Sequence, residues 1–202
     1  MKFDQALNIV LKHEGGYALV PGDRGGETYK GISRVNWPKW PGWQIIDQNK
    51  PLRNNSTIKN LLLDEMVNIF YKVEFWDKIN ADKLPAAIRP LLFDFAVNSG
   101  ISTAVKSFQR VLQDTVGKTT FIDGKVGAET IKLANQADPK TLFENFKQAR
   151  LNFYNKIVEN NPSQKKFLKG WLNRLNSFKY TAVLTTGFIL IGLLAYLALK
   201  SN

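Results

Sequence analysis

Apolar residues recur at every third or fourth position through most of the 202-residue chain, which is the spacing of helices that bury one face. Near the N-terminus, Phe3, Leu7, Val10 and Leu11 form such a stripe. The Gly15-Gly16 pair is expected to end this helix, because glycine adopts left-handed backbone angles at low cost. Further helices are expected over residues 57–79, 86–98, 102–113 and 139–160, and from Pro162 onward. The pattern predicts a mainly α fold.

The stretch between residues 17 and 33 breaks this helical periodicity. It contains Pro21-Gly22-Asp23-Arg24-Gly25-Gly26, a run of residues that favour turns. A run of this kind is typical of the tight connection between two short strands. We therefore expect a small β-hairpin that faces the C-terminal end of the first helix.

The C-terminus carries a continuous run of apolar and small residues from Tyr180 to Leu199. About 20 helical residues, rising roughly 1.5 Å each, match the roughly 30 Å hydrocarbon core of a bilayer. Lys179 and Lys200 flank the run, as charged residues do at membrane interfaces. A buried core helix is the alternative, but no polar stripe marks an exposed face. We expect a transmembrane helix over residues 180–199 that anchors the protein at its C-terminus.

The N-terminal residues lead directly into the first helix, without the apolar segment of a secretory signal peptide. Basic residues are more numerous before the apolar run than after it. The positive-inside rule then places the main body of the chain on the cytoplasmic side of the membrane.

The composition limits the chemistry that the chain can carry out. Its net charge of +11 favours anionic partners: nucleic acid, anionic lipid or the acidic polymers of a bacterial wall. Nucleic acid is not expected, since no basic cluster alternates with base-stacking aromatic residues. With no cysteine and one histidine, a thiolate zinc site, a cysteine nucleophile and a histidine-based triad are not expected either. We expect no metal and no cofactor.

Glu14 is the first candidate for catalysis. It stands at the C-terminal end of the first helix, where the helix dipole disfavours a negative charge. Partial burial against Tyr17 would act in the same direction. A glutamic acid that stays protonated near neutral pH is what a glycosidase needs as its general acid. The alternative, an ordinary carboxylate at a helix end, is equally compatible with this position.

A second carboxylate, Asp23, follows about nine positions later in the turn-rich segment. It is placed to position or activate a water molecule, which the hydroxyl of Thr28 would help to hold. Asp23 would equally serve to stabilise its own turn through the local backbone. Glu27 is a third candidate, although a solvent-facing hairpin position is the simpler interpretation for it. The separation of the Glu14 and Asp23 carboxyl groups would decide between inversion and retention at the anomeric carbon.

Two further regions have polar or aromatic residues that suit a saccharide. Asp94 and Asn98 are four positions apart on one helix and therefore share a face. They would line a cleft and bind sugar hydroxyl groups, or simply pair with each other. Residues 37–43 hold three tryptophans, which would either stack on sugars or cover the core. We favour the packing role for this loop.

Several blocks follow one another in a distinctive order. They are His13-Glu14-Gly15-Gly16-Tyr17, Pro21 to Thr28, Gly31-Ile32-Ser33, Phe75-Trp76-Asp77, Phe93 to Gly100, Asp123-Gly124 with Gly127 and Thr130, and Phe167 with Gly170 to Arg174. In this order they resemble the N-acetylmuramidases of glycoside hydrolase family 108, with their C-terminal peptidoglycan-binding part. The resemblance implies a lysozyme-like helical domain over residues 1–100 and a peptidoglycan-binding helical part over 101–175. The tryptophan loop and the apolar span at 180–199 are not general features of the family.

The resemblance also implies roles for individual residues. Glu14 would be the catalytic acid, and Glu14, Asp23 and Thr28 together are similar to the Glu–Asp–Thr set of phage-type lysozymes. Apart from the resemblance, we expect Tyr17, Asp94 and Asn98 to bind the substrate.

The implied activity is hydrolysis of the β-1,4 bond between N-acetylmuramic acid and N-acetylglucosamine in bacterial peptidoglycan. We expect a membrane-anchored enzyme encoded by a bacteriophage, placed in the host inner membrane for lysis or in the internal membrane of a lipid-containing virion for entry. The alternative function is a non-catalytic wall-binding membrane anchor or secretion helper.

Overall fold

The computed structural model describes residues 1–19, 26–118 and 121–181. It is mainly helical, as the periodicity predicts, with one small sheet. The helices are α1 (Phe3–Glu14), α2 (Gly42–Gln48), α3 (Leu61–Tyr71), α4 (Ile88–Ser99), α5 (Ile101–Val116), α6 (Ala128–Gln136), α7 (Pro139–Asn160) and α8 (Lys165–Ser177). Short helical turns lie at Lys72–Trp76, Ala81–Lys83 and Pro162–Gln164.

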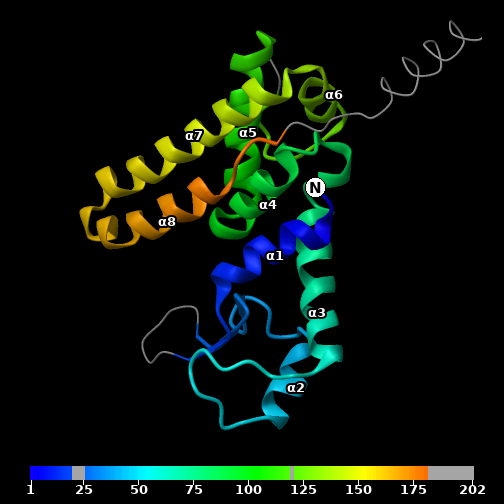
Figure 1. Ribbon diagram of the computed structural model, residues 1–202, viewed down its shortest axis with the longest axis vertical. Helices are drawn as coiled ribbons and strands as arrows, with labels where there is room; N and C mark the ends of the chain where they lie inside the picture. The colour runs from blue at the N-terminus through cyan, green and yellow to red at the C-terminus, as the bar shows by residue number, and fades with distance from the viewer. Residues whose placement is uncertain (20–25, 119–120, 182–202) are drawn as a thin grey trace, which may run out of the picture.

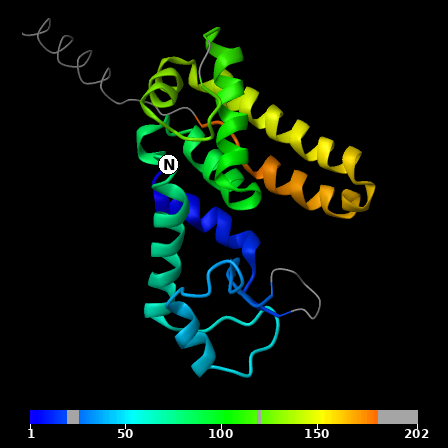
Figure 2. The ribbon, with the colours of Figure 1, turned by 180° about the vertical axis from the view of Figure 1, so that it is seen from behind.

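Helix α1 lies between two groups of elements (Figures 1 and 2). On one side are the sheet, α2 and the early part of α3, and on the other are α4 to α8. The buried face of α1 carries Ala6, Leu7 and Val10 and packs against α3 and α4. The helix ends at Glu14, because Gly15 turns the chain away with a φ of 65°. The last residue of α1 is therefore held where the two groups of elements meet.

The expected hairpin is a sheet of three very short antiparallel strands. They are β1 (Tyr17–Ala18), β2 (Thr28–Tyr29) and β3 (Ile32–Ser33), in the order β1-β2-β3. Strand β2 pairs with β1 and with β3, so that Tyr29 lies opposite both Tyr17 and Ile32. The additional pairing arises because a second turn, at Lys30-Gly31, follows β2 directly. This second turn brings the chain back toward the end of α1.

The helix expected from residue 57 begins at Leu61 instead. The side chain of Asn60 accepts a hydrogen bond from the backbone N–H of Leu63 at 2.9 Å, which satisfies one of the free donors of the first turn. Helix α3 continues through Tyr71 and passes into the wider helical turn that ends at Trp76. This turn buries Trp76 against Phe3 and Phe93, with ring centroids 5.5 Å and 5.4 Å away.

Helices α4, α5 and α7 form the centre of the second group. Every residue of α4 from Pro90 to Ala96 is buried, including the charged side chain of Asp94. Phe95 of α4 and Phe108 of α5 both contact Phe146 of α7. Among these aromatic rings lies Arg150 of α7, also fully buried. A buried charge needs a partner, and the partner of Arg150 belongs to the candidate site.

The prediction of a C-terminal transmembrane helix, and with it the single-pass membrane location, is corrected by the structure. No helix in residues 1–19, 26–118 and 121–181 is long and apolar enough to cross a bilayer. Helix α8 ends at Ser177, and neither Tyr180 nor Thr181 is helical. The remainder of the expected span, residues 182–199, lies outside the described residues.

Candidate functional site

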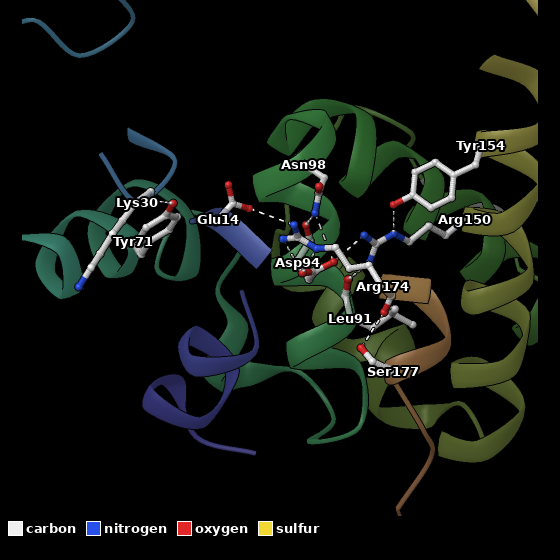
Figure 3. Close-up of polar contacts among 10 residues, drawn as sticks. All are labelled: Glu14, Lys30, Tyr71, Leu91, Asp94, Asn98, Arg150, Tyr154, Arg174 and Ser177. Atoms are coloured by element: carbon white, nitrogen blue, oxygen red, sulfur yellow. Dashed lines mark hydrogen bonds and ion pairs between the residues drawn. The ribbon is translucent and has the colours of Figure 1, made fainter. Parts of the chain in front are cut away.

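Glu14 lies at the meeting point of the two groups of elements. Its side chain is 19% exposed, so the carboxyl group is largely enclosed but still open on one side. Figure 3 shows it between Tyr71 and Lys30 in one direction and the row formed by Arg174, Asp94 and Arg150 in the other. These neighbours come from α3, from the turn after β2 and from α4, α7 and α8.

The turn between β2 and β3 lies directly against the Glu14 carboxyl group. Gly31 has a φ of 80°, and a Cβ atom added to it would stand 2.6 Å from Oε2 of Glu14 and 2.7 Å from the hydroxyl of Tyr71. Only glycine fits both the backbone angle and this spacing. The Tyr71 hydroxyl donates a hydrogen bond to the carbonyl of Lys30 at 2.7 Å, which fixes the turn to α3.

Tyr71 is a neutral neighbour of Glu14. Burial, and to a smaller extent the negative charge of Glu14, raise the pKa of the Tyr71 phenol far above its usual value. The phenol therefore stays protonated near neutral pH and remains a hydrogen-bond donor.

On its other side, Glu14 is paired with an arginine from the last helix. Arg174 Nη1 donates to Oε1 of Glu14 at 3.0 Å. The same guanidinium reaches Oδ1 of Asp94 through Nε and Nη2, each at 2.8 Å. The second oxygen of Asp94, Oδ2, accepts from Nη2 of Arg150 at 2.5 Å. Two carboxyl groups and two guanidinium groups thus form a row that connects α1 with α4, α7 and α8 (Figure 3).

Asp94 and Asn98 do pair with each other, which was one of the two alternatives for them. Asp94 is buried, however, whereas Asn98 is exposed. Asp94 is fully buried, and both of its oxygens are used by arginines. It therefore lies below the surface, where a saccharide would not reach it. Asn98 is exposed near the end of α4 and donates through Nδ2 to the carbonyl of Asp94 at 2.7 Å and to its Oδ2 at 3.3 Å. Its side-chain oxygen takes no part in these bonds.

The remaining candidates lie on or beside the sheet. Thr28 is half-buried in β2, between Ala18 of β1 and Ser33 of β3. The ring of Tyr17 is buried in the core, and burial together with a hydrogen bond to Glu27 raises the pKa of its phenol. Asp23 lies outside the described residues.

Glu27 does not face solvent, as the simpler interpretation of the sequence assumed. It is 9% exposed and forms ion pairs with Arg34 at 2.8 Å and with Lys50 at 2.7 Å. Both cations also pair with Asp47. Glu27 therefore connects the sheet to the end of α2.

The surface next to Glu14 is hollowed. A cavity of about 650 Å³ runs along the end of α1 and the β2–β3 turn. Its lining combines one apolar side chain, Leu11, with small and polar residues that can bind a hydroxyl-rich ligand: Asn8, Lys12, Gly15, Gly16, Lys30, Asn55 and Thr57. Glu14 is not itself in this lining, but Gly15, the next residue along the chain, is.

The tryptophan loop serves mainly as packing. Trp40 and Trp43 are buried, with their rings 5.2 Å apart, and only Trp37 is partly exposed. Trp37 and Trp40 border an apolar cavity of about 640 Å³ on the outer face of α3. This cavity includes none of the residues that contact Glu14.

Three neighbours of Glu14 received no individual role from the sequence: Gly31, Tyr71 and Arg174. A weak signal existed for Arg174, since it stands in the helical block from Gly170 to Arg174 beside buried Leu175. No pattern along the chain indicates that this arginine meets the first helix. Within the part of the chain that the structure describes, no group of three or more His, Cys, Asp or Glu side chains is arranged to hold a metal ion.

Comparison with known proteins gives two matches along the chain. Residues 7–100 match the family model described as Glycosyl hydrolase 108, and residues 103–176 match the model described as Predicted Peptidoglycan domain. A solved structure described as "Structure of Brucella abortus SagA" is 27% identical, with a TM-score of 0.61. The similarity covers 87% of this chain and 90% of that one. No curated protein gives a significant match.

Proposed function

Because the chain belongs to the glycosyl hydrolase 108 family, and is therefore a glycoside hydrolase that cleaves peptidoglycan, we propose that Glu14 is its catalytic acid. The bond cleaved is the β-1,4 linkage between N-acetylmuramic acid and N-acetylglucosamine. The observation that carries the assignment is the position of Glu14. It is a carboxyl group, 19% exposed, at the place where α1, the β2–β3 turn and α8 meet, and the residue after it, Gly15, lines the neighbouring cavity.

In the proposed reaction, Glu14 gives its proton to the glycosidic oxygen. The bond between that oxygen and the anomeric carbon breaks, and the electron pair stays with the departing sugar. A water molecule then adds to the anomeric carbon and loses a proton. The positively charged Arg174, 3.0 Å away, stabilises the carboxylate that Glu14 becomes.

We propose that Asp23 positions or activates the water molecule that attacks the anomeric carbon, and that the hydroxyl of Thr28 helps to hold this water. Thr28 stands in the central strand of the sheet, two residues before the turn that contacts Glu14. An Asp23→Asn variant should lose most of its activity if the carboxylate activates water. The anomer that forms first, followed by NMR, distinguishes the two stereochemical courses: inversion gives the α-product and retention gives the β-product.

Among the three residues expected to bind substrate, we propose that Asn98 contacts the sugar. It is exposed, and its amide oxygen is not used by its bonds to Asp94. Tyr17 and Asp94 act from below the surface, where they hold the sheet and the charged row in place.

We further propose that catalysis and substrate binding are carried by different parts of the chain. Residues 1–100 carry the acid and the cavity, and residues 101–175 hold the peptidoglycan. The net charge of +11 supports binding to an acidic wall polymer. The expected bacteriophage origin stays a prediction.

The test is release of dye from labelled, purified peptidoglycan. A Glu14→Gln variant keeps the shape of the side chain but cannot donate a carboxylic proton, so its rate should fall by at least about 100-fold. Glu129→Gln, at an exposed carboxylate in α6, is the matched control and should retain full activity. Full activity of the Glu14→Gln variant would rule out the proposed role.

A further inference from the structure

We propose that Arg174 is a positioning residue for the reaction: it binds Oε1 of Glu14, so that the proton to be transferred sits on Oε2. The inference rests on the proposed role of Glu14 as the acid. It assigns part of the catalytic site to α8, which lies within the region matched as a peptidoglycan domain.

The Arg174 guanidinium is held rigidly. Its Nε and Nη2 atoms both lie 2.8 Å from Oδ1 of Asp94, and the residue is 8% exposed. Asp94 is itself fixed, because Arg150 binds its other oxygen from the opposite side. With these contacts made, the planar fork of Arg174 points its remaining nitrogen, Nη1, at Glu14.

Glu14 is in turn held from two directions. Oε1 accepts the hydrogen bond from Arg174, while Oε2 lies against the backbone of Gly31. A glutamate has three rotatable side-chain bonds, and these two contacts from opposite sides restrict all of them. The carboxyl plane is therefore set before substrate binds, which is the preorganisation that efficient proton transfer needs.

The contact also determines which oxygen carries the proton. A guanidinium has donors and no acceptor, so the oxygen it binds must act as an acceptor. When Glu14 is protonated, its hydrogen consequently belongs on Oε2. The glycosidic oxygen must therefore approach Oε2, from a direction that the Gly31 backbone does not cover. The proton passes from Oε2 to the glycosidic oxygen as the glycosidic bond breaks, and Oε1 keeps its hydrogen bond throughout.

Arg174 stays charged during this cycle. Burial alone would lower the pKa of its guanidinium, but the carboxylates of Asp94 and Glu14 outweigh that effect and raise it. Arg174 therefore neither gives nor takes a proton. It acts on the reaction only through the orientation and the charge of Glu14.

An Arg174→Lys variant tests the inference with little risk to the fold. A lysine keeps a positive charge for Asp94, but its single ammonium group cannot bind Asp94 and Glu14 as a fork does. We expect the rate at saturating peptidoglycan to fall by about 10-fold to 100-fold. The concentration for half-saturation, and sedimentation with intact peptidoglycan, should change by less than about 2-fold, because Arg174 acts on the acid and not on binding.

Arg150→Lys is the matched control. It makes the same substitution in the same charged row and weakens the same aspartate, but Arg150 does not contact Glu14. Because Arg150 reaches Glu14 only through Asp94 and Arg174, the rate per folded molecule of Arg150→Lys should fall much less than that of Arg174→Lys, measured at a temperature below the unfolding transitions of both variants. A second variant, Arg174→Met, should lose at least as much rate as Arg174→Lys.

The rates of these variants distinguish a failure of the positioning role of Arg174 from a failure of the acid role of Glu14. Equal losses of rate in the Arg174→Lys and Arg150→Lys variants would mean that the row is only structural and would overturn the inference. Full rate in Arg174→Lys, with Glu14→Gln inactive, would overturn it as well. If Glu14→Gln itself keeps full rate, the proposed acid role fails first.

Discussion

Gly31 and Glu14 touch across the site: a Cβ atom on Gly31 would lie 2.6 Å from Oε2 of the glutamate. The two residues belong to different elements, the β2–β3 turn and the end of α1. Their contact brings the sheet against the acid and closes one side of it.

A Gly31→Ala substitution should therefore reduce activity more than its effect on stability explains. The methyl group would displace Glu14 or the Tyr71 hydroxyl, and the φ of 80° adds strain of about 1 kcal/mol. We expect at least a 10-fold loss of dye release from peptidoglycan. Gly117→Ala is the control, because its φ of 65° imposes similar strain with no atom within 4 Å. Similar rates in the two variants would argue against the close contact.

The buried charged row should make a large contribution to stability that depends on Asp94. An Asp94→Asn variant leaves the buried guanidinium of Arg150 with no negative partner and removes one of the two carboxylates that Arg174 contacts, so the free energy of unfolding should fall by about 3–5 kcal/mol. Urea denaturation followed by circular dichroism measures the change. Asp77→Asn, in the exposed pair with Lys72, should cost less than about 1 kcal/mol. A small effect at Asp94 would mean that the row is not closed in solution.

Tyr71 should affect both stability and rate. In a Tyr71→Phe variant the carbonyl of Lys30 loses its hydrogen bond, at a cost of about 1–2 kcal/mol, and the turn against Glu14 loosens. We expect activity to fall by about 3-fold to 10-fold. Tyr154→Phe is the comparison, since it also removes a buried hydroxyl, one that accepts from Arg150 at 2.8 Å, but lies away from Glu14. A variant at Tyr71 with unchanged kinetics would contradict the role given to the turn.

Acid should weaken the ion pairs that tie the sheet to α2. Hydrogen bonds from Arg34 and then from Lys50 lower the pKa of Asp47 from 3.8 to about 2. Because the folded-state pKa lies below the unfolded value, the stabilisation is present above about pH 4 and is lost as the pH falls toward about 2. The side chain is 47% exposed, so the contribution should stay below about 1 kcal/mol. The difference in unfolding free energy between the natural protein and Asp47→Asn should become smaller from pH 6 to pH 2. A difference that stays constant over this range would show that the Asp47 ion pairs do not contribute to stability in this way.

The local features of the fold could be predicted because they depend on neighbouring residues. The stripe from Phe3 to Leu11 and the glycine pair after Glu14 predict α1 and its end, and the structure agrees at Glu14. The start of α3 was harder to predict from the sequence: the helix was expected from residue 57 and begins at Leu61. It depends on the side chain of Asn60 capping the helix, which interrupts an otherwise continuous apolar pattern.

The same reasoning failed where a pattern has more than one physical solution. Apolar length alone predicted a membrane span over residues 180–199, whereas the described residues contain no such helix. Asp94 and Asn98 share a helix face, as their spacing requires, but spacing does not say whether that face meets solvent or the core. Here Asp94 is buried.

The sequence by itself determined that Glu14 ends a helix, that a turn-rich segment follows it, and that the fold is mainly α. These properties follow from backbone preferences and from periodicity over a few residues. Only the tertiary structure decided which groups surround the acid. Arg174 meets Glu14 across 160 positions of sequence, and that contact depends on how α8 packs against α4 and α7 through Asp94 and Arg150. No local pattern encodes such a contact, because it arises from the packing of the whole core.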